Sequence, residues 1–281
     1  MSIMRKLREY LNRPLSFAVF LLIIISTVIT AFTVVFIIGY IFIKGVPNLS
    51  LDLFSLKYSS SNQSMLPSII NAVYLTALTL LLSVPIGIFS AIYLAEYSRK
   101  NSFFVKIINI ANETLSGIPS IVYGLFGFLA FVISKKWGYS LLAGVITLAI
   151  MVLPLIIRTS QEAMLGVDDT FREASYGLGA GKLRTVFKIV LPSAMPGILS
   201  GIILAIGRIV GETAALIYTA GTVPEAATKL TSSSRTISVH LYCLLNEGLY
   251  TEQAYATAVV LIVFVVIINA LSNALAKKIM K

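Results

Sequence analysis

Two ionisable residues, Arg208 and Glu212, lie inside the apolar segment 196–220. Residues four positions apart share one face of an α-helix, so the two side chains are expected to meet. If the segment spans a membrane, a lone charge at its centre costs about 2.5–3.5 kcal/mol or more, and such a charge needs a partner or a polar cavity. A guanidinium is permanently charged and offers paired donors to oxyanions. The pair therefore predicts either a self-neutralised contact or a site for an anion.

The helical face that carries this pair is otherwise small and polar. Its members recur at steps of three and four: Gly201, Ala205, Arg208, Glu212, Ala215 and Thr219. In one interpretation the small residues let helices pack closely and the charged pair neutralises itself. In the other, the face lines a pathway in which Arg208 meets an anion and Glu212 holds Arg208 in position. Both interpretations stay open from the residues alone, and the second is our working hypothesis.

The elements that position these residues are expected to be membrane-spanning helices. Hydrophobic residues make up 57% of the chain and charged residues 12%, against roughly 25% charged in soluble domains. Six apolar runs approach the length of about 20 residues that crosses a bilayer: 17–43, 67–95, 114–133, 140–157, 196–220 and 254–276. The sequence predicts an all-α, polytopic integral membrane protein with six transmembrane helices, the first an uncleaved anchor.

The net charge of +10 follows membrane topology rather than nucleic-acid binding. Most of the 22 Lys and Arg residues lie in four places that fall on one side of the predicted spans. These are the N-terminal tail, the connection 96–113, the loop 158–195 and the C-terminus. Positive residues accumulate on the cytoplasmic side of membrane proteins. Both termini and the loop 158–195 are therefore expected in the cytoplasm, and residues 103–113, which are amphipathic, along the inner membrane surface.

Several chemistries are not expected in this chain. Cys243 is the only cysteine, so no intrachain disulfide can form, and His240 has no metal-ligand spacing around it. The segment Gly179-Ala180-Gly181-Lys182 is followed by Leu183, whereas a phosphate loop needs Ser or Thr there. No catalytic cluster accompanies it. We expect a non-enzymatic chain without metal, cofactor or bound nucleotide.

The polar loop 158–195 predicts two short helices that meet at a glycine turn. Thr170 and Glu173 have capping-box spacing, so the first helix is expected to start there and to stop within 177–181. An apolar stripe of helical spacing follows Lys182. Pro192 and Pro196 are expected to end that second helix before the fifth span.

This loop resembles the EAA loop of permease subunits in bacterial ABC importers. Seven residues carry the resemblance: Glu173, Ala174, Ser175, Gly179, Ile189, Leu191 and Pro192. Ser175 departs from the family pattern, which has Ala there. The resemblance implies a type I importer permease fold of the MetI-like kind. It also implies that the loop is the coupling element that sits in a groove of an ATPase subunit.

Three further segments resemble the permeases of phosphate importers: 115–124, 207–214 and 251–256. The Gly-Glu-Thr-Ala form at residues 211–214 favours the PstA family over its sister family, PstC. The resemblance covers 67–276, the transmembrane core, and leaves 1–66 as a tail, first helix and outer loop and 277–281 as a cytoplasmic tail. It implies a permease in the bacterial cytoplasmic membrane that forms half of an inward pathway for inorganic phosphate.

The resemblance also implies the partners. They are a second, PstC-like permease, a dimer of PstB-like ATPase subunits that binds the ATP, and an extracytoplasmic, PstS-like phosphate-binding protein. Membrane lipid surrounds the assembly, and no nucleic acid is expected.

Three further residues are candidates for the anion pathway. Arg158 lies where the fourth span meets the cytoplasm, as an exit contact or as a snorkelling anchor. Ser116 and Ser120 flank a helix start, where they could receive an anion or merely cap the helix. A permease for molybdate, tungstate or sulfate is the alternative function. A secondary carrier that needs no ATPase is the alternative from a different class.

Overall fold

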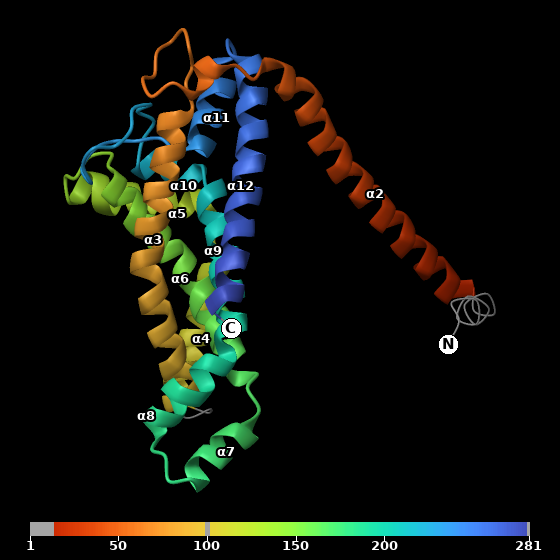
Figure 1. Ribbon diagram of the computed structural model, residues 1–281, viewed down its shortest axis with the longest axis vertical. Coiled ribbons are helices and arrows are strands. Elements are labelled where there is room, and N and C mark those ends of the chain that lie inside the picture. Colours follow the sequence, from red (N-terminus) through yellow and green to blue (C-terminus); the bar gives the residue numbers. More distant parts are fainter. Residues whose placement is uncertain (1–13, 99–101, 280–281) are drawn as a thin grey trace.

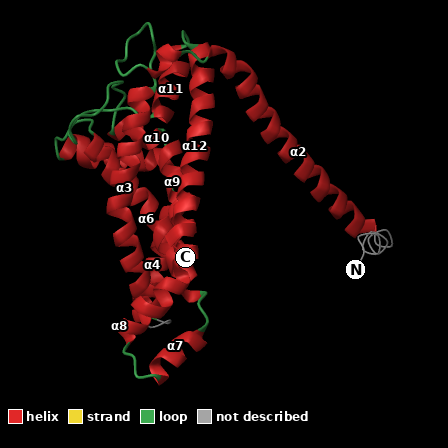
Figure 2. Cartoon of the chain, in the orientation of Figure 1, coloured by secondary structure: helices red, strands yellow, loops and turns green. Residues whose placement is uncertain are grey.

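The computed structural model describes residues 14–98 and 102–279, and every regular element in these ranges is helical (Figure 2). Several basic residues lie outside the described residues: those of the tail 1–13, Arg99, Lys100 and Lys281. The prediction that they lie in the cytoplasm therefore has no structural counterpart.

Five helical stretches are long and apolar enough to cross a membrane. They are α2 (Pro14–Gly45), α3 (Leu66–Ile92) with the π-helical turn Tyr93–Tyr97, α6 (Leu141–Leu165), α9 (Leu191–Gly211) with α8 (Lys182–Thr185) and the π-helical turn Val186–Val190 before it, and α12 (Thr251–Ile279). The all-helical membrane class is confirmed.

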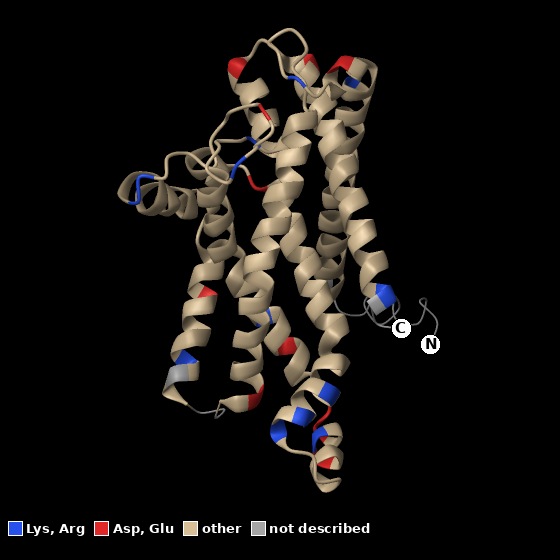
Figure 3. Ribbon diagram, turned by 60° about the vertical axis from the view of Figure 1, so that its left-hand side comes forward, with Lys and Arg blue, Asp and Glu red and all other residues tan. Residues whose placement is uncertain are grey.

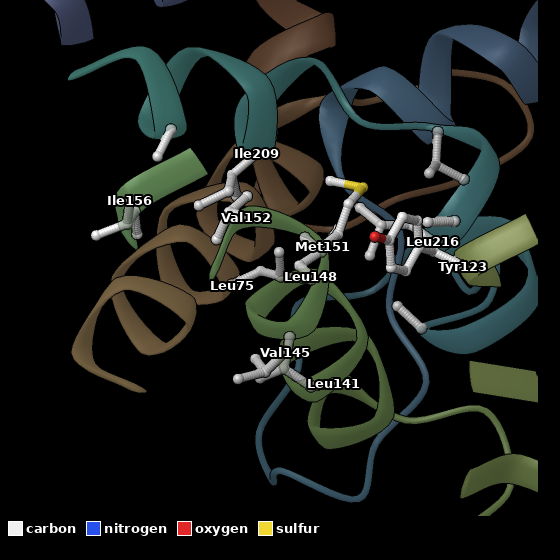
Figure 4. Packing of buried hydrophobic residues seen from close by; sticks show 14 residues of the cluster. Leu75, Tyr123, Leu141, Val145, Leu148, Met151, Val152, Ile156, Ile209 and Leu216 are labelled. Atoms are coloured by element: carbon white, nitrogen blue, oxygen red, sulfur yellow. The ribbon is translucent and has the colours of Figure 1, made fainter. Parts of the chain in front are cut away.

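The bundle is centred on α6, which packs against α3 on one side and α9 on the other (Figure 1). Leu148 and Met151 of α6 are fully buried between Leu75 of α3 and Ile209 of α9 (Figure 4). Glycines bring the helices close: a Cβ on Gly87 would lie 2.6 Å from Ile156 Cγ2. Close van der Waals packing is the main stabilisation between helices in lipid, where apolar burial alone gives little. In contrast, α2 leaves the bundle, and among the described residues it packs mainly against α12 near its C-terminal end.

The third predicted span, 114–133, is not one straight helix. The helix α4 (Phe103–Gly117) and the helix α5 (Ser120–Gly127), which continues into a π-helical turn Phe128–Ser134, meet at a bend of 100°. The break falls at Ile118, whose backbone is extended, as is favoured for a residue that precedes proline. With this bent pair the chain has up to six spans.

The prediction that residues 103–113 lie along the inner membrane surface stays a prediction. These residues belong to α4, which stands alongside the bundle (Figure 3). Val105 is buried against Leu94 at the end of α3 and Ile157 of α6. Protein therefore covers α4 at Val105, whereas its apolar residues Phe103, Ile107 and Ile110 remain 79%, 46% and 63% exposed.

The fifth predicted span, 196–220, also differs from expectation at both ends. Pro192 lies in the first turn of α9 and Pro196 inside it, so neither proline separates the loop from the span. The chain stays helical from Lys182 to Gly211, through the π-helical turn Val186–Val190 that directly precedes Pro192. At the other end the helix stops at Gly211, and a short helix α10 (Ala214–Thr219) follows after an extended residue.

The two ends of the bundle differ in character. One end carries α7 (Asp169–Gly177), α8 and a concentration of Lys and Arg side chains (Figure 3). The opposite end carries α11 (Ile237–Glu247), the short turns Val46–Asn48 and Leu51–Phe54, and the connecting loops (Figure 1). There Asn71 of α3 holds the last loop: its Nδ2 donates to the carbonyls of Glu225 (2.9 Å) and Arg235 (3.1 Å), and its Oδ1 accepts from Ala227 N (2.8 Å).

Candidate functional site

The break between α9 and α10 is organised by Glu212. This residue ends α9 in an extended conformation and is 8% exposed. Its Oε1 accepts a hydrogen bond from Ala215 N (3.1 Å), and its carbonyl accepts one from Ser238 Oγ (2.7 Å). A carboxylate near a helix N-terminus is stabilised by the free N–H groups and the helix dipole. Glu212 therefore caps α10 and ties the break to the start of α11.

The predicted contact between Arg208 and Glu212 does not form. Among the described residues Arg208 makes no ion pair and no side-chain hydrogen bond. Its side chain is half-buried, and the Tyr123 phenol lies within electrostatic reach of its charge. Because Arg208 lies in the last turn of α9, the negative end of the helix dipole stabilises the cation in part. The guanidinium thus keeps its donors free for a ligand.

The rest of the small and polar face is used for helix packing. Cβ atoms built on Gly201 and Gly124 would clash with Thr159 and with Ala215. Thr219 is fully buried, and its hydroxyl donates to Ala215 O (2.8 Å). For Gly201, Ala215 and Thr219 the packing interpretation is therefore the better one.

The bend between α4 and α5 lies close to Arg208 through Tyr123, whose hydroxyl donates to Leu115 O (2.8 Å). Ser116 is in the last turn of α4 and donates to Asn112 O (2.7 Å). Ser120 is the first residue of α5, and its hydroxyl has no hydrogen-bond partner in the described part of the chain. Near this bend, Ser120 and Arg208 are the predicted pathway residues without a side-chain hydrogen bond among the described residues.

Arg158 lies deeper toward the charged end of the bundle. Its Nε donates to Glu162 Oε1 at 2.9 Å, and its side chain is 56% exposed. It lines a polar cavity of about 180 Å³ with Glu113 and the amide side chains of α4. Gly201 packs against Thr159 next to it, and Arg208 is seven residues further along α9, or ~10 Å at 1.5 Å per residue. The two cations are therefore at different depths and do not form one site.

The polar loop 158–195 folds into the two predicted helices with a glycine turn between them. Gly179 has a φ of +81°, which glycine adopts without the cost that other residues incur. The first helix starts earlier than the predicted capping box, because Asp168 is its cap. Asp168 Oδ1 accepts from Thr170 N (2.9 Å) and Thr170 Oγ1 (2.8 Å), and these hydrogen bonds lower the pKa of the Asp168 carboxyl.

The loop is fastened to the bundle by Arg172, which the sequence analysis did not single out. Its guanidinium donates to Glu96 Oε1 from Nη2 (2.7 Å) and Nε (3.2 Å), and to Asp169 Oδ1 from Nη1 (3.0 Å). It also donates to the carbonyls of Met164 (2.8 Å) and Val167 (2.7 Å). The side chains of Arg172 and Glu96 are only 13% and 5% exposed. One guanidinium thus joins α7 to the ends of α3 and α6.

Two further contacts hold α8, one to α7 and one to the end of α3. Ser175, the residue that replaces the usual Ala, shares a buried hydrogen bond of 2.9 Å with Thr185. Lys182 Nζ lies 4.9 Å from the centre of the Tyr97 ring. Outside these contacts the loop presents an apolar groove of about 390 Å³, lined in part by Phe171 and Leu178. Leu178 is 90% exposed, and an apolar surface of this kind is typical of a protein contact.

Comparison with known proteins matches residues 83–281 to the family described as "Binding-protein-dependent transport system inner membrane component". The Bacillus subtilis (strain 168) protein "Probable ABC transporter permease protein YqgI" is 32% identical over 82% of this chain and 84% of its own length. "Phosphate transport system permease protein PstA" of Pasteurella multocida is 34% identical over 94% and 93%, and the Haemophilus influenzae protein of the same name is 36% identical over 70% of each.

Solved structures support the fold. A bacterial ABC transporter that imports the acidic polysaccharide alginate contains a chain that aligns with a TM-score of 0.66, over 99% of this chain and all of its own, at 17% identity. An inward-facing MetNI methionine ABC transporter aligns with a TM-score of 0.59 over 76% of this chain, also at 17% identity. At such low identity the likeness establishes the architecture alone.

Proposed function

This chain belongs to the binding-protein-dependent transport system inner membrane components, and we propose that it forms half of the pathway by which inorganic phosphate enters a bacterial cell. As a family member it is a multi-pass, non-catalytic permease subunit of an ABC importer, and it works with an ATPase and a substrate-binding protein. The names of the Pasteurella and Haemophilus relatives support phosphate as the substrate. The observation that carries the proposal is the Arg208 guanidinium, whose donors are free within the bundle.

Arg208 suits a tetrahedral oxyanion for electrostatic and geometric reasons. A guanidinium is a cation, and its paired N–H groups match two oxygens of one phosphate. Ser120 adds a neutral donor on the neighbouring bend. An anion in transit needs binding that is favourable but reversible, and one cation with a few neutral donors provides that balance.

The force for transport enters at α7 and α8 in this proposal. The apolar groove beside Leu178 receives the ATPase subunit, and Arg172 passes the displacement of α7 to the ends of α3 and α6. Because α6 packs along α9, a tilt of α6 moves the helix that carries Arg208. The ATP itself is bound by the partner ATPase subunits, and this chain requires no cofactor of its own.

We infer the orientation in the membrane from the distribution of charge, and the partner contacts from the surfaces that this chain leaves exposed. The end with α7 and α8 gathers Lys and Arg (Figure 3), so we place it and both chain termini in the cytoplasm. The helix α2 has no buried residue in its apolar window, and we assign its exposed side to the second, PstC-like permease and to lipid. The opposite end of the bundle then faces a PstS-like binding protein, and the ATPase partners are PstB-like.

Phosphate uptake by cells that carry the complete importer tests the substrate. We expect radiolabelled phosphate to enter, and a tenfold excess of sulfate, molybdate or tungstate to leave its uptake unchanged. Arg208→Gln should reduce uptake by about tenfold or more, because a charge-assisted contact to the anion is lost. Lys106→Gln, which removes an exposed cation of α4, serves as the matched control and should transport normally at equal membrane level.

Two results contradict the proposal. Normal uptake by the Arg208→Gln variant would remove Arg208 from the pathway. Efficient competition by another oxyanion would assign the importer to that anion instead.

A further inference from the structure

A second buried cation, Arg235, lies at the end of the bundle opposite α7. It precedes α11, and only 4% of its surface is exposed. Its backbone is fixed, since its N–H donates to Val223 O (2.9 Å) and its carbonyl accepts from Asn71 Nδ2 (3.1 Å). In contrast, Nε and Nη2 of its side chain are buried and have no hydrogen-bond partner among the described residues. The backbone of Arg235 is thus held by hydrogen bonds, while Nε and Nη2 of its guanidinium have none.

The neighbours of Arg235 do not neutralise its charge. The Tyr58 ring centre lies 4.7 Å from Cζ, and no ion pair of the described residues includes Arg235. His240 is fully buried and edge-on to Tyr58. Burial and the charge of Arg235 lower the pKa of His240 to about 3, so the imidazole is neutral at physiological pH. Burial likewise raises the pKa of the Cys243 thiol, against the opposing charge of Arg235 and a hydrogen bond with its side chain. The thiol is thus a neutral neighbour that supplies no counter-charge to Arg235.

A buried cation without an anion is costly, and a cation–π contact offsets only part of that cost. Guanidinium cannot escape by losing its proton. Proteins keep such a group where an anion reaches it during function. The cluster of Arg235, His240 and Tyr58 therefore has the composition of an anion site: one permanent charge, one neutral imidazole and an aromatic wall.

We propose that Arg235 and His240 form an outer oxyanion site, at which a phosphate-class anion is held before it reaches Arg208. This rests on the proposed function, because the anion is the transported one. The anion accepts hydrogen bonds from Nε and Nη2 of Arg235. A neutral imidazole has one donor and one acceptor, so His240 suits a protonated phosphate, which has both.

The position of the site is consistent with a pathway toward Arg208. Ser238, in the first turn of α11, donates to the carbonyl of Glu212 at the α9–α10 break. The outer site and the break that follows Arg208 are thus built on directly connected segments. Tyr58 covers the guanidinium, and its hydroxyl donates to Gln63 Oε1 (2.8 Å).

Phosphate binding to the purified complete importer, without the binding protein, tests the outer site. All variants also carry Arg208→Gln, which removes the contact between phosphate and Arg208, and radiolabelled inorganic phosphate is the probe. We expect the Arg208→Gln complex to retain one phosphate site, and the addition of Arg235→Gln to weaken that site by about tenfold or more. Lys229→Gln, which removes an exposed cation of the same loop, should leave it unchanged. The Arg235→Gln complex should unfold at the same or a higher temperature, since it loses an uncompensated buried charge and keeps its backbone contacts.

Three outcomes overturn the outer site while the proposed function stands. The first is equal phosphate binding with and without Arg235. The second is normal uptake by Arg235→Gln in a system whose wild type imports phosphate. The third is a rise in the unfolding temperature that depends on Arg235 and occurs with phosphate-free binding protein but not with phosphate. That result would assign the counter-charge of Arg235 to a protein carboxylate. A wild-type complex that neither binds nor imports phosphate would instead overturn the proposed function.

Discussion

Arg208 and Glu212 carry opposite charges and serve different parts of the molecule. The carboxylate is engaged by Ala215 N at the start of α10, whereas the guanidinium in the last turn of α9 has no described partner. A charge that is satisfied within the fold stabilises local structure, and one that is not is available for a ligand. At the scale of single residues, the function therefore depends on where each charge points, more than on the spacing of the two in the sequence.

Substitutions at Glu212 test this division. Glu212→Gln keeps an oxygen that accepts from Ala215 N, so we expect uptake within about twofold of the wild type. Glu212→Ala loses the cap, which is worth roughly 0.5–2 kcal/mol, and should lower the thermal unfolding temperature and uptake together. If Gln were as damaging to uptake as Ala, the carboxylate charge itself would be required and the capping role would be insufficient.

Titration of His240 gives a second test at this scale. Its folded pKa of about 3 lies below the value of 6.5 in an unfolded chain. The unfolded chain therefore takes up the proton first as pH falls, so this residue's contribution to stability is present above pH 6.5 and is lost between pH 6.5 and 3. We expect the unfolding temperature of the purified protein to fall between pH 7 and 5, and to fall less in His240→Gln. Equal slopes in the two proteins would show that the imidazole is not buried in its neutral form.

Among the elements, composition and local signals predicted some features and not others. The apolar runs and the turn at Gly179 follow from side-chain transfer energies and from backbone freedom, which are local properties. Pro119 marks the break at Ile118 locally, but the 100° angle there and the break at Glu212 are not marked by hydropathy. They depend on tertiary packing, as where Gly124 of α5 admits Ala215 of α10. The same holds for Arg172 and Glu96, which are 76 residues apart.

The connection between Arg172 and Glu96 predicts how the coupling element works. Arg172→Gln or Glu96→Gln removes one partner of a buried pair, which costs about 3–5 kcal/mol and should release α7 from α3. In reconstituted importer we expect ATP hydrolysis to continue while phosphate transported per ATP falls severalfold. Combining Arg172→Glu with Glu96→Arg should restore part of the coupling. Lys106→Gln is the control. Loss of hydrolysis and transport in equal proportion would indicate a folding or assembly defect instead.

At the scale of the whole molecule, α2 is the helix that its own chain leaves uncovered. This helix leaves the bundle (Figure 1), and its exposed side includes Phe32, which is 69% exposed. Its contact with the bundle is limited to the region near Tyr255, where Gly45 and Tyr40 pack. A long helix that buries almost nothing in its own chain is explained by a partner chain or by lipid.

A photo-crosslinking residue in place of Phe32 distinguishes the two. We expect an adduct with the second permease in membranes that contain both permeases, because α2 then packs on that subunit. Without the second permease the same residue should label lipid alone. Lipid labelling in both membranes would show that α2 is a free anchor.

The central claim is that a separate ATPase acts on α7 and α8, and that the resulting movement of the bundle drives phosphate past Arg208. Its most direct test is phosphate uptake into proteoliposomes that contain both permeases, with and without the ATPase subunits. With binding protein outside and ATP available to the ATPase, we predict uptake that depends on ATP hydrolysis and is lost in Arg208→Gln. The permeases alone should transport nothing, even along a phosphate gradient. Sustained uptake by the permeases without the ATPase would contradict the account and identify a secondary carrier.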